Sequence, residues 1–215
     1  MKKLISALIL IACTWQIFTN PSIANFFKAD STSPKKEPHP GIVKVMPQQL
    51  KVSASSHHKV DDYTVNELHS FRIRARILSK KNYATGRETD LSTTDLALGW
   101  GKMSDLKVLE KITISQSGRW YFWNTSNFPI PRREIETLSA NMHLIPATPA
   151  VQTQIDATQK GDIIEITGSL VKVSSNKDNW TWKSSETRND TGNGACEVIW
   201  VKELKIAGKP TQEVR

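Results

Sequence analysis

Cysteine is scarce in this sequence of 215 residues. Only Cys13 and Cys196 occur, and Cys13 lies inside an apolar N-terminal segment. Once that segment is set apart, Cys196 has no partner in the chain. The folded domain is therefore expected to lack an internal disulfide and to depend on its hydrophobic core.

The sequence also lacks the short motifs of common enzyme classes. It contains no GxSxG nucleophile elbow, no HExxH zinc motif, no P-loop and no Rossmann glycine pattern. His57, His58, Asp61 and Asp62 stand close together, but their spacing matches no metal site and a solvated linker accounts for them. The sequence therefore predicts neither a metal ion nor another cofactor.

Acidic residues are outnumbered by basic ones. The chain has 29 lysines and arginines against 21 aspartates and glutamates, which gives a formal net charge of +8. A basic surface attracts anionic partners such as lipid headgroups, acidic glycans or nucleic acid. Charge alone does not choose among these partners, and an exported protein makes nucleic acid the weakest candidate.

The N-terminus predicts export. Residues 1–24 combine two lysines, an apolar stretch from Leu4 to Phe18 and small residues before Asn25, as in a cleaved signal peptide. Two alternatives remain open, a lipidated Cys13 and an uncleaved membrane anchor. Each of the three predicts a periplasmic or membrane-anchored domain. Residues 25–65, rich in proline, serine, lysine and histidine, are expected to form a flexible tether.

Residues 66–208 are expected to form one mainly β (α+β) domain, followed by a tail at 209–215. Alternating side chains predict a strand at 70–79, and Thr148 and Pro149 predict the start of a helix over about 149–160. Strands are also expected at 161–173, 180–184 and 195–206. This order fits a small OB-like Greek-key barrel with a mixed insertion at about 79–147, which includes a short helix at 95–98.

Four blocks of this domain resemble a family of uncharacterised exported or membrane-associated bacterial proteins. The blocks are DLALGWGKMSD, SQSGRWYFW, SANMHLIPA and SSETRNDTGNGACEVIWV, and the resemblance covers roughly residues 70–205. The family brings no established activity, ligand or catalytic residue. The resemblance therefore groups the chain without assigning it a function.

The candidate binding residues are mostly arginines and aromatics. One strand face should carry three guanidinium groups, which suit phosphate or carboxylate, although a solvated face is the simpler interpretation. Aromatic side chains at 120–123 should lie two on each side of a strand, for core packing or for stacking on sugars. A turn-rich loop at 187–194 should lie at the mouth of the barrel. The candidates are Arg72, Arg74, Arg76, Arg119, Trp120, Arg188 and Asp190.

A catalytic interpretation depends on His143, with Asp95 or Cys196 assisting. Cys196 shares the parity of Val198 and Trp200, which predicts that its thiol packs in the core. We therefore expect a non-enzymatic envelope module that binds an anionic lipid, a glycan or another envelope protein. A hydrolase or transferase using His143 and a purely structural envelope protein are the alternatives.

Overall fold

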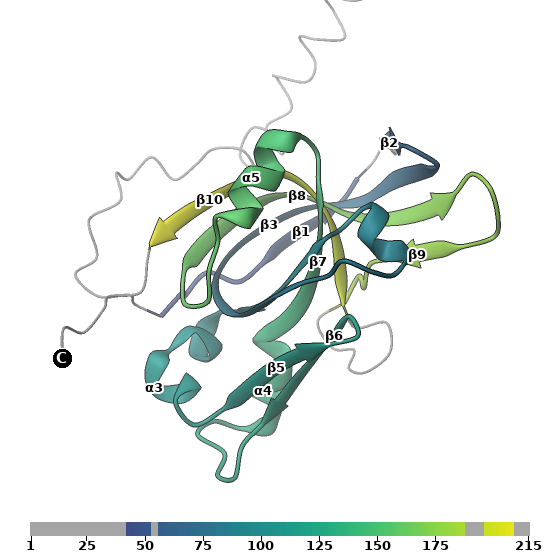
Figure 1. Ribbon diagram of the computed structural model, residues 1–215. Coiled ribbons are helices and arrows are strands. Elements are labelled where there is room, and N and C mark those ends of the chain that lie inside the picture. The colour runs from purple at the N-terminus through teal and green to yellow at the C-terminus, as the bar shows by residue number, and fades with distance from the viewer. Residues whose placement is uncertain (1–41, 53–55, 188–195, 209–215) are drawn as a thin grey trace, which may run out of the picture. The chain divides into compact units, whose positions relative to one another are not determined.

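The computed structural model describes residues 42–52, 56–187 and 196–208, which form a mainly β fold (Figure 1). The predicted signal segment, Cys13, the tail, Arg188 and Asp190 lie outside the described residues. No helix within the described ranges is both long and apolar enough to cross a membrane.

Five strands make up the central part of an eight-stranded sheet. They are β3 (Tyr63–Asn82), β4 (Thr94–Gly99), β7 (Ser139–Pro146), β8 (Ile163–Ser175) and β10 (Glu197–Gly208). β3 pairs with β4, β4 with β7, β7 with β10, β10 with β8, and β8 again with β3. The pairings therefore form a closed cycle, in which β7 and β10 are parallel and the other pairs antiparallel.

Shorter elements surround this cycle. β1 (Gln48–Lys51) and β2 (His57–Val60) both pair with β3, and β9 (Thr181–Lys183) pairs with β8. A separate hairpin is formed by β5 (Thr113–Ser117) and β6 (Trp120–Asn124). The helical segments are η1 (Arg87–Asp90), η2 (Gly101–Ser104), α3 (Leu106–Leu109), α4 (Arg132–Thr137) and α5 (Pro149–Asp156).

Two locally encoded elements are confirmed. The strand expected at 70–79 lies within the 20 residues of β3. In α5, Thr148 Oγ1 accepts a hydrogen bond from the Val151 amide and Pro149 is the first helical residue. The helix ends at Asp156, and the Lys80 ammonium donates to carbonyls in and after its last turn, at Ile155, Asp156 and Thr158.

Three expectations about organisation are wrong. The stretch 25–65 is not all tether, because β1, β2 and the start of β3 lie within it. Residues 95–98 form part of β4 and not a helix, since this strand is hydrogen-bonded on both sides and buried throughout. The expected insertion at 79–147 includes two strands of the cycle, β4 and β7. The inserted segment is therefore only residues 100–138, which connect these two strands.

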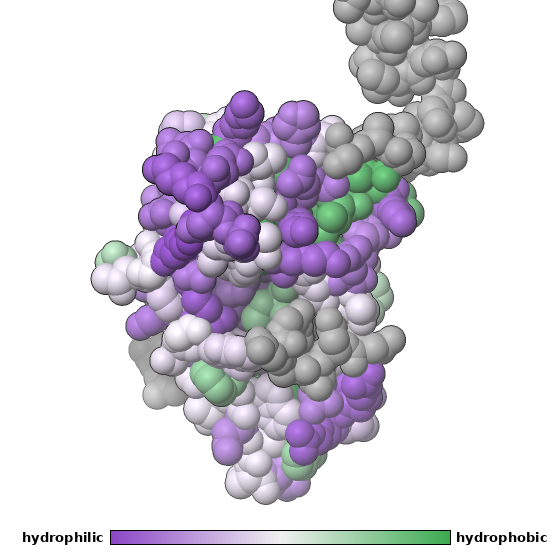
Figure 2. Space-filling model, turned by 90° about the vertical axis from the view of Figure 1, so that its right-hand side faces the viewer, coloured by the Kyte–Doolittle hydropathy of each residue, from purple (hydrophilic) through white to green (hydrophobic). Residues whose placement is uncertain are grey.

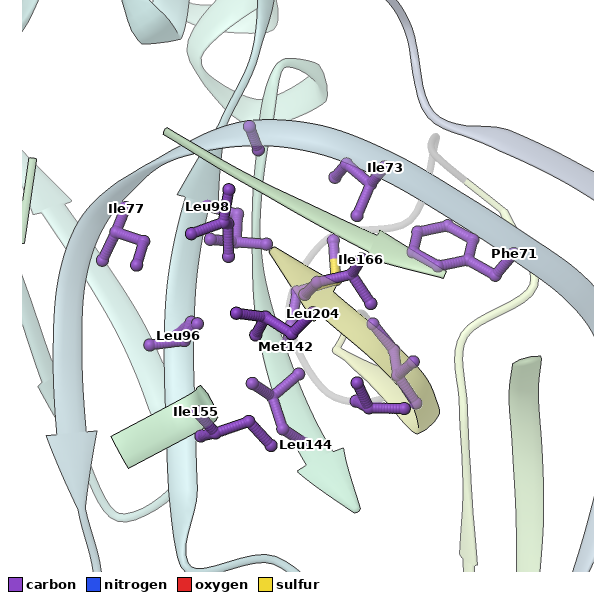
Figure 3. Close-up of a cluster of buried hydrophobic side chains, with 14 of the residues drawn as sticks. Phe71, Ile73, Ile77, Leu96, Leu98, Met142, Leu144, Ile155, Ile166 and Leu204 are labelled. Carbon is purple, nitrogen blue, oxygen red and sulfur yellow. The ribbon is translucent and has the colours of Figure 1, made fainter. Parts of the chain in front are cut away.

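The main core lies inside the cycle. Figure 3 shows side chains from β3, β4, β7, β8, β10 and α5 pointing toward one another, among them Phe71, Leu98 and Ile166. Gly168 allows β8 and β10 to approach closely, because a Cβ added there would lie 2.1 Å from the Trp200 carbonyl oxygen.

A bulge in β10 changes which side chains face that core. The register shifts between Val201 and Glu203. Before the shift, Val198 and Trp200 pack in a second cluster that lies outside the main core. After the shift, Leu204 packs in the main core. Val198 and Trp200 therefore face away from the main core that Leu204 enters, although the three residues have the same parity, because a bulge exchanges the two faces of a strand.

Candidate functional site

The hairpin of β5 and β6 is set by its two-residue turn. Gly118 and Arg119 have φ values of 57° and 67°, the positive values that a type I′ turn requires. Across the turn, Ser117 pairs with Trp120. The short turn therefore fixes the register of the aromatic strand that follows it.

Aromatic side chains alternate along β6. Trp120 and Phe122 are 38% and 50% exposed, whereas Tyr121 and Trp123 pack against the buried cluster beneath the hairpin. The prediction that two aromatic residues lie on each side of this strand is confirmed. Trp120, a predicted binding residue, is thus accessible to a ligand.

A pocket of about 510 Å³ runs along β6, and most of the large side chains in its lining are aromatic. β6 forms one wall, the first residues of β7 lie opposite, and α4 contributes a charged pair, Arg132 and Glu136, whose Nε and Oε1 are 2.9 Å apart. The lining consists of residues 120–125, Phe128, Arg132, Glu136, residues 139–141 and Cys196. The pocket thus offers aromatic rings together with hydrogen-bonding groups.

Tyr121 helps to fix this lining. Its hydroxyl lies 3.0 Å from Ser139 Oγ, so the side chain bridges β6 and β7. Burial raises the pKa of Tyr121 to about 12, against a smaller lowering by the hydrogen bond to Ser139. The phenol is therefore neutral at physiological pH and serves as a wall and a hydrogen-bonding group, not as a base.

The Arg119 guanidinium joins the hairpin to the main sheet. Nη1 donates to Asp95 Oδ1 at 2.8 Å and Nη2 donates to the Ser92 carbonyl at 2.8 Å. The guanidinium carbon also lies 4.1 Å from the centroid of the Tyr83 ring. The Arg119 side chain is only 15% exposed. The guanidinium that the sequence suggested for ligand binding is therefore engaged in contacts within the protein.

The backbone of Arg119 is also held by hydrogen bonds, in addition to its side chain. Its amide donates to the Tyr83 hydroxyl, and its carbonyl accepts from Asn141 Nδ2 at 3.1 Å. Gln116 Nε2 donates in turn to Asn141 Oδ1 at 2.7 Å. Amide side chains therefore position the turn of the hairpin at one end of the pocket.

His143 and Asp95 lie next to each other beneath this region. His143 Nδ1 is 2.9 Å from Asp95 Oδ1, a distance that fits an ion pair, although the contact lacks hydrogen-bond geometry. Their side chains are 4% and 0% exposed, and the imidazole packs against the Trp182 ring at 4.8 Å. Neither residue lines the pocket. Asp95, Arg119 and His143 thus lie together, but in the interior and not in an open cleft.

Cys196 differs from its prediction. It is half-buried and lines the pocket, whereas the sequence placed its thiol in the core. Its sulfur lies 4.0 Å from the Arg119 carbonyl oxygen. The reason is positional, because Cys196 precedes the first residue of β10 and so lies before the part of the strand that packs in the core.

The three arginines of β3 do not form one binding stripe. Arg76 is 1% exposed, with Nε donating to the Ser104 carbonyl at 2.8 Å and Nη1 to the Gly161 carbonyl at 2.9 Å. Arg74 forms an ion pair with Glu165 at 2.9 Å. Neither a binding stripe nor a solvated face therefore describes all three arginines, since Arg76 is buried and Arg74 is paired. Arg72 is half-buried.

All four sequence blocks contribute to this place. DLALGWGKMSD supplies Asp95, SQSGRWYFW supplies Arg119 and the aromatic strand, SANMHLIPA supplies Asn141 and His143, and SSETRNDTGNGACEVIWV supplies Cys196. Comparison with protein families, with curated proteins and with solved structures finds no match for this chain. The site must therefore be interpreted from its own chemistry.

Sequence reasoning missed part of the pocket. Phe122 was not among the predicted binding residues, although it alternates with Trp120 along the aromatic strand and so could have been included. Phe128 and Arg132 carried no comparable signal, since their positions depend on how the turn at 125–131 folds over Trp123, whose ring centroid is 6.0 Å from that of Phe128.

Proposed function

We propose that this chain is an exported, non-enzymatic binding module that holds a glycan in the aromatic pocket beside β6. The pocket itself carries the proposal. Exposed aromatic faces at Trp120 and Phe122 suit stacking on sugar rings, and the half-buried rings behind them give the wall rigidity. Export and an envelope location belong to the same proposal, and the signal-like pattern of residues 1–24 supports them.

The polar lining supports a sugar ligand over a purely apolar one. Asn124, Thr125 and Asn141 offer amide and hydroxyl groups, and Arg132 with Glu136 offers a cation beside a carboxylate. Hydroxyl groups of a glycan both donate and accept hydrogen bonds, so a lining of mixed donors and acceptors matches them.

An OB-like barrel is the finer fold that we propose for this domain. The cyclic strand order, the parallel third and fifth strands and the helix between the third and fourth strands support it. In OB folds, oligosaccharides and oligonucleotides bind over the second and third strands and the adjoining loops. The pocket adjoins the third strand, β7, which agrees with that location.

The alternative of a hydrolase or transferase has less support. Its acid/base candidate, His143, is 4% exposed and does not line the pocket, so a ligand there would not meet the imidazole in this conformation. Cys196 does line the pocket, but the contact of its sulfur at 4.0 Å is with the Arg119 carbonyl oxygen, and a carbonyl is not the general base that activates a cysteine nucleophile.

An extended peptide is a second candidate ligand, because β6 has a free edge. Among the described strands, β6 pairs only with β5. The alternation of antiparallel pairing, counted from the pair Ser117–Trp120, directs the backbone groups of Tyr121 and Trp123 away from β5. A peptide could add there as a further strand.

Binding to immobilised oligosaccharides, including acidic glycans and peptidoglycan fragments, tests the proposal. The variant Trp120→Ala/Phe122→Ala should lose binding to any glycan that the wild type retains. Leu50→Ala is the matched control, since Leu50 is 52% exposed and lies outside the pocket lining. Failure to bind any glycan would refute the glycan ligand, and equal binding by the double variant would refute the pocket. Binding of linear peptides, lost in the same double variant, would favour the second candidate.

A further inference from the structure

A second group of exposed apolar side chains lies far from the pocket in the sequence. Ile42, Val45, Met46 and Leu50 are 42%, 54%, 51% and 52% exposed, and we call them the apolar strip. Figure 2 shows apolar residues gathered in separate areas of a mainly hydrophilic face. Four large exposed apolar residues within nine positions exceed the single scattered ones that need no explanation.

The apolar strip is held on the domain at both ends. Val43 is 4% exposed and belongs to the main core, its amide donates to Ser104 Oγ at 2.7 Å, and its carbonyl accepts from the Gly101 amide at 2.8 Å. At the other end, Leu50 pairs with Ser70 in β3. The strip is therefore presented by a fixed backbone, so its exposure is not the result of a loose end.

The charges around the strip have one sign. Lys44 and Lys51 are exposed, and residues 42–52 contain no acidic side chain. Beyond this segment, Glu186 accepts a hydrogen bond from Gln49 Nε2 through its carbonyl, and its carboxylate is paired with Lys183. Apolar side chains flanked by lysines are the composition of surfaces that rest on anionic bilayers.

The strip is also the first described segment that follows the apolar segment Leu4–Phe18 in the sequence. Residues 19–41 separate the two, and 23 residues of extended chain span at most roughly 80 Å. If the N-terminal segment remains in a bilayer, the strip is the first described part of the domain that follows it. A separation of at most this length keeps the strip near such a bilayer and so raises its local concentration at the membrane surface.

We propose that the apolar strip, with Lys44 and Lys51, docks on the surface of an anionic lipid bilayer. The valine, methionine and leucine side chains would enter the interfacial region while the two ammonium groups meet lipid phosphates. Docking by this surface would orient the domain on the membrane. The proposal is independent of the glycan pocket, because the two use different residues.

Hydrogen exchange of the full chain on vesicles tests this. The chain is reconstituted into phosphatidylcholine vesicles with or without phosphatidylglycerol, so that the N-terminal segment meets a bilayer in both. Amides of residues 42–52 should exchange several-fold more slowly on the anionic vesicles. The variant Val45→Ser/Met46→Ser/Leu50→Ser should lose that protection, and Lys44→Glu/Lys51→Glu should lose its dependence on phosphatidylglycerol.

Phe122→Ser is the matched control, an exposed apolar residue at the pocket that should leave the protection unchanged. Equal exchange at 42–52 on the two kinds of vesicle, in wild type and triple variant alike, would overturn the proposal. Protection that rises with protein concentration on neutral vesicles would also overturn it, because a second copy of the chain would then cover the strip.

Discussion

Replacing Arg119 by methionine tests whether this arginine holds the hairpin on the sheet or is available to a ligand. The substitution keeps an unbranched side chain of similar reach and removes the charge and the donors. Arginine and methionine meet the same strain at a φ of 67°, so the cost of that backbone conformation cancels between them.

The expected loss of stability follows from the partners of the guanidinium. Asp95 is 0% exposed, and removing Arg119 would leave that buried carboxylate without its cation. Breaking a buried ion pair by removing one partner costs about 3–5 kcal/mol. The hydrogen bond to Ser92 and the contact with the Tyr83 ring act in the same direction. We therefore expect Arg119→Met to lower the free energy of unfolding by about 3–5 kcal/mol.

Urea unfolding followed by circular dichroism measures this quantity. Arg132→Met is the matched control, since Arg132 lies at the same pocket, is 71% exposed and pairs with Glu136, and such a pair contributes about 0–1 kcal/mol. Asp95→Asn should cost less than Arg119→Met, because the guanidinium that it leaves unpaired is 15% exposed, whereas the carboxylate left unpaired by Arg119→Met is 0% exposed. The double variant should cost less than the sum of the two, which is the signature of a direct interaction.

A result in which Arg119→Met is as stable as Arg132→Met would refute this reasoning. The guanidinium would then be free in solution, as the sequence suggested, and Arg119 would return to the list of ligand-binding residues. Loss of glycan binding without loss of stability would lead to the same conclusion.

Three further predictions concern the sheet and its helix. Gly168→Ala should lower the melting temperature by about 2–12 °C, because its Cβ would lie 2.1 Å from the Trp200 carbonyl oxygen, whereas Gly208→Ala should be neutral with its nearest atom at 3.9 Å. Burial would raise the pKa of Glu67, but hydrogen bonds from His58, Lys202 and Ser169 outweigh it and lower that pKa. The stability this carboxylate contributes should therefore be present above the ordinary glutamate pKa of about 4.3 and be lost as pH falls below it through the lowered folded-state pKa, and Glu67→Gln should flatten that part of a urea-midpoint profile. Lys80→Met should cost about 1–3 kcal/mol in urea unfolding, since Lys80 donates to three carbonyls in and after the last turn of α5.

Local patterns predicted the elements whose signals lie within a few residues. The alternation at 70–79 was sufficient for β3, since one face of that strand is apolar. Thr148 and Pro149 were sufficient for the start of α5, because capping involves only adjacent residues. The aromatic strand at 120–123 was also predicted from this range, but the turn at Gly118 and Arg119 that precedes it was not.

Patterns failed where burial comes from both sides. Polar and apolar residues do not alternate at 95–98, because β4 is a central strand between β3 and β7 and is buried on both faces. Such a strand cannot be distinguished from a short buried helix by its pattern alone. The bulge after Val201 likewise left no trace in the sequence, although it decides which residues of β10 enter the main core.

The sequence by itself determined some elements of this protein, among them β3 and the start of α5, and the aromatic character of its candidate site. Tertiary structure alone decided which charged and reactive side chains remain available. Arg72 and Arg76 share a parity, yet Arg76 is buried because the Ser104 and Gly161 carbonyls cover it. Cys196 reaches the pocket, more than seventy residues after Trp120, because β10 joins β7. Exposure depends on which distant segment packs against a side chain, and periodicity along one strand does not contain that information.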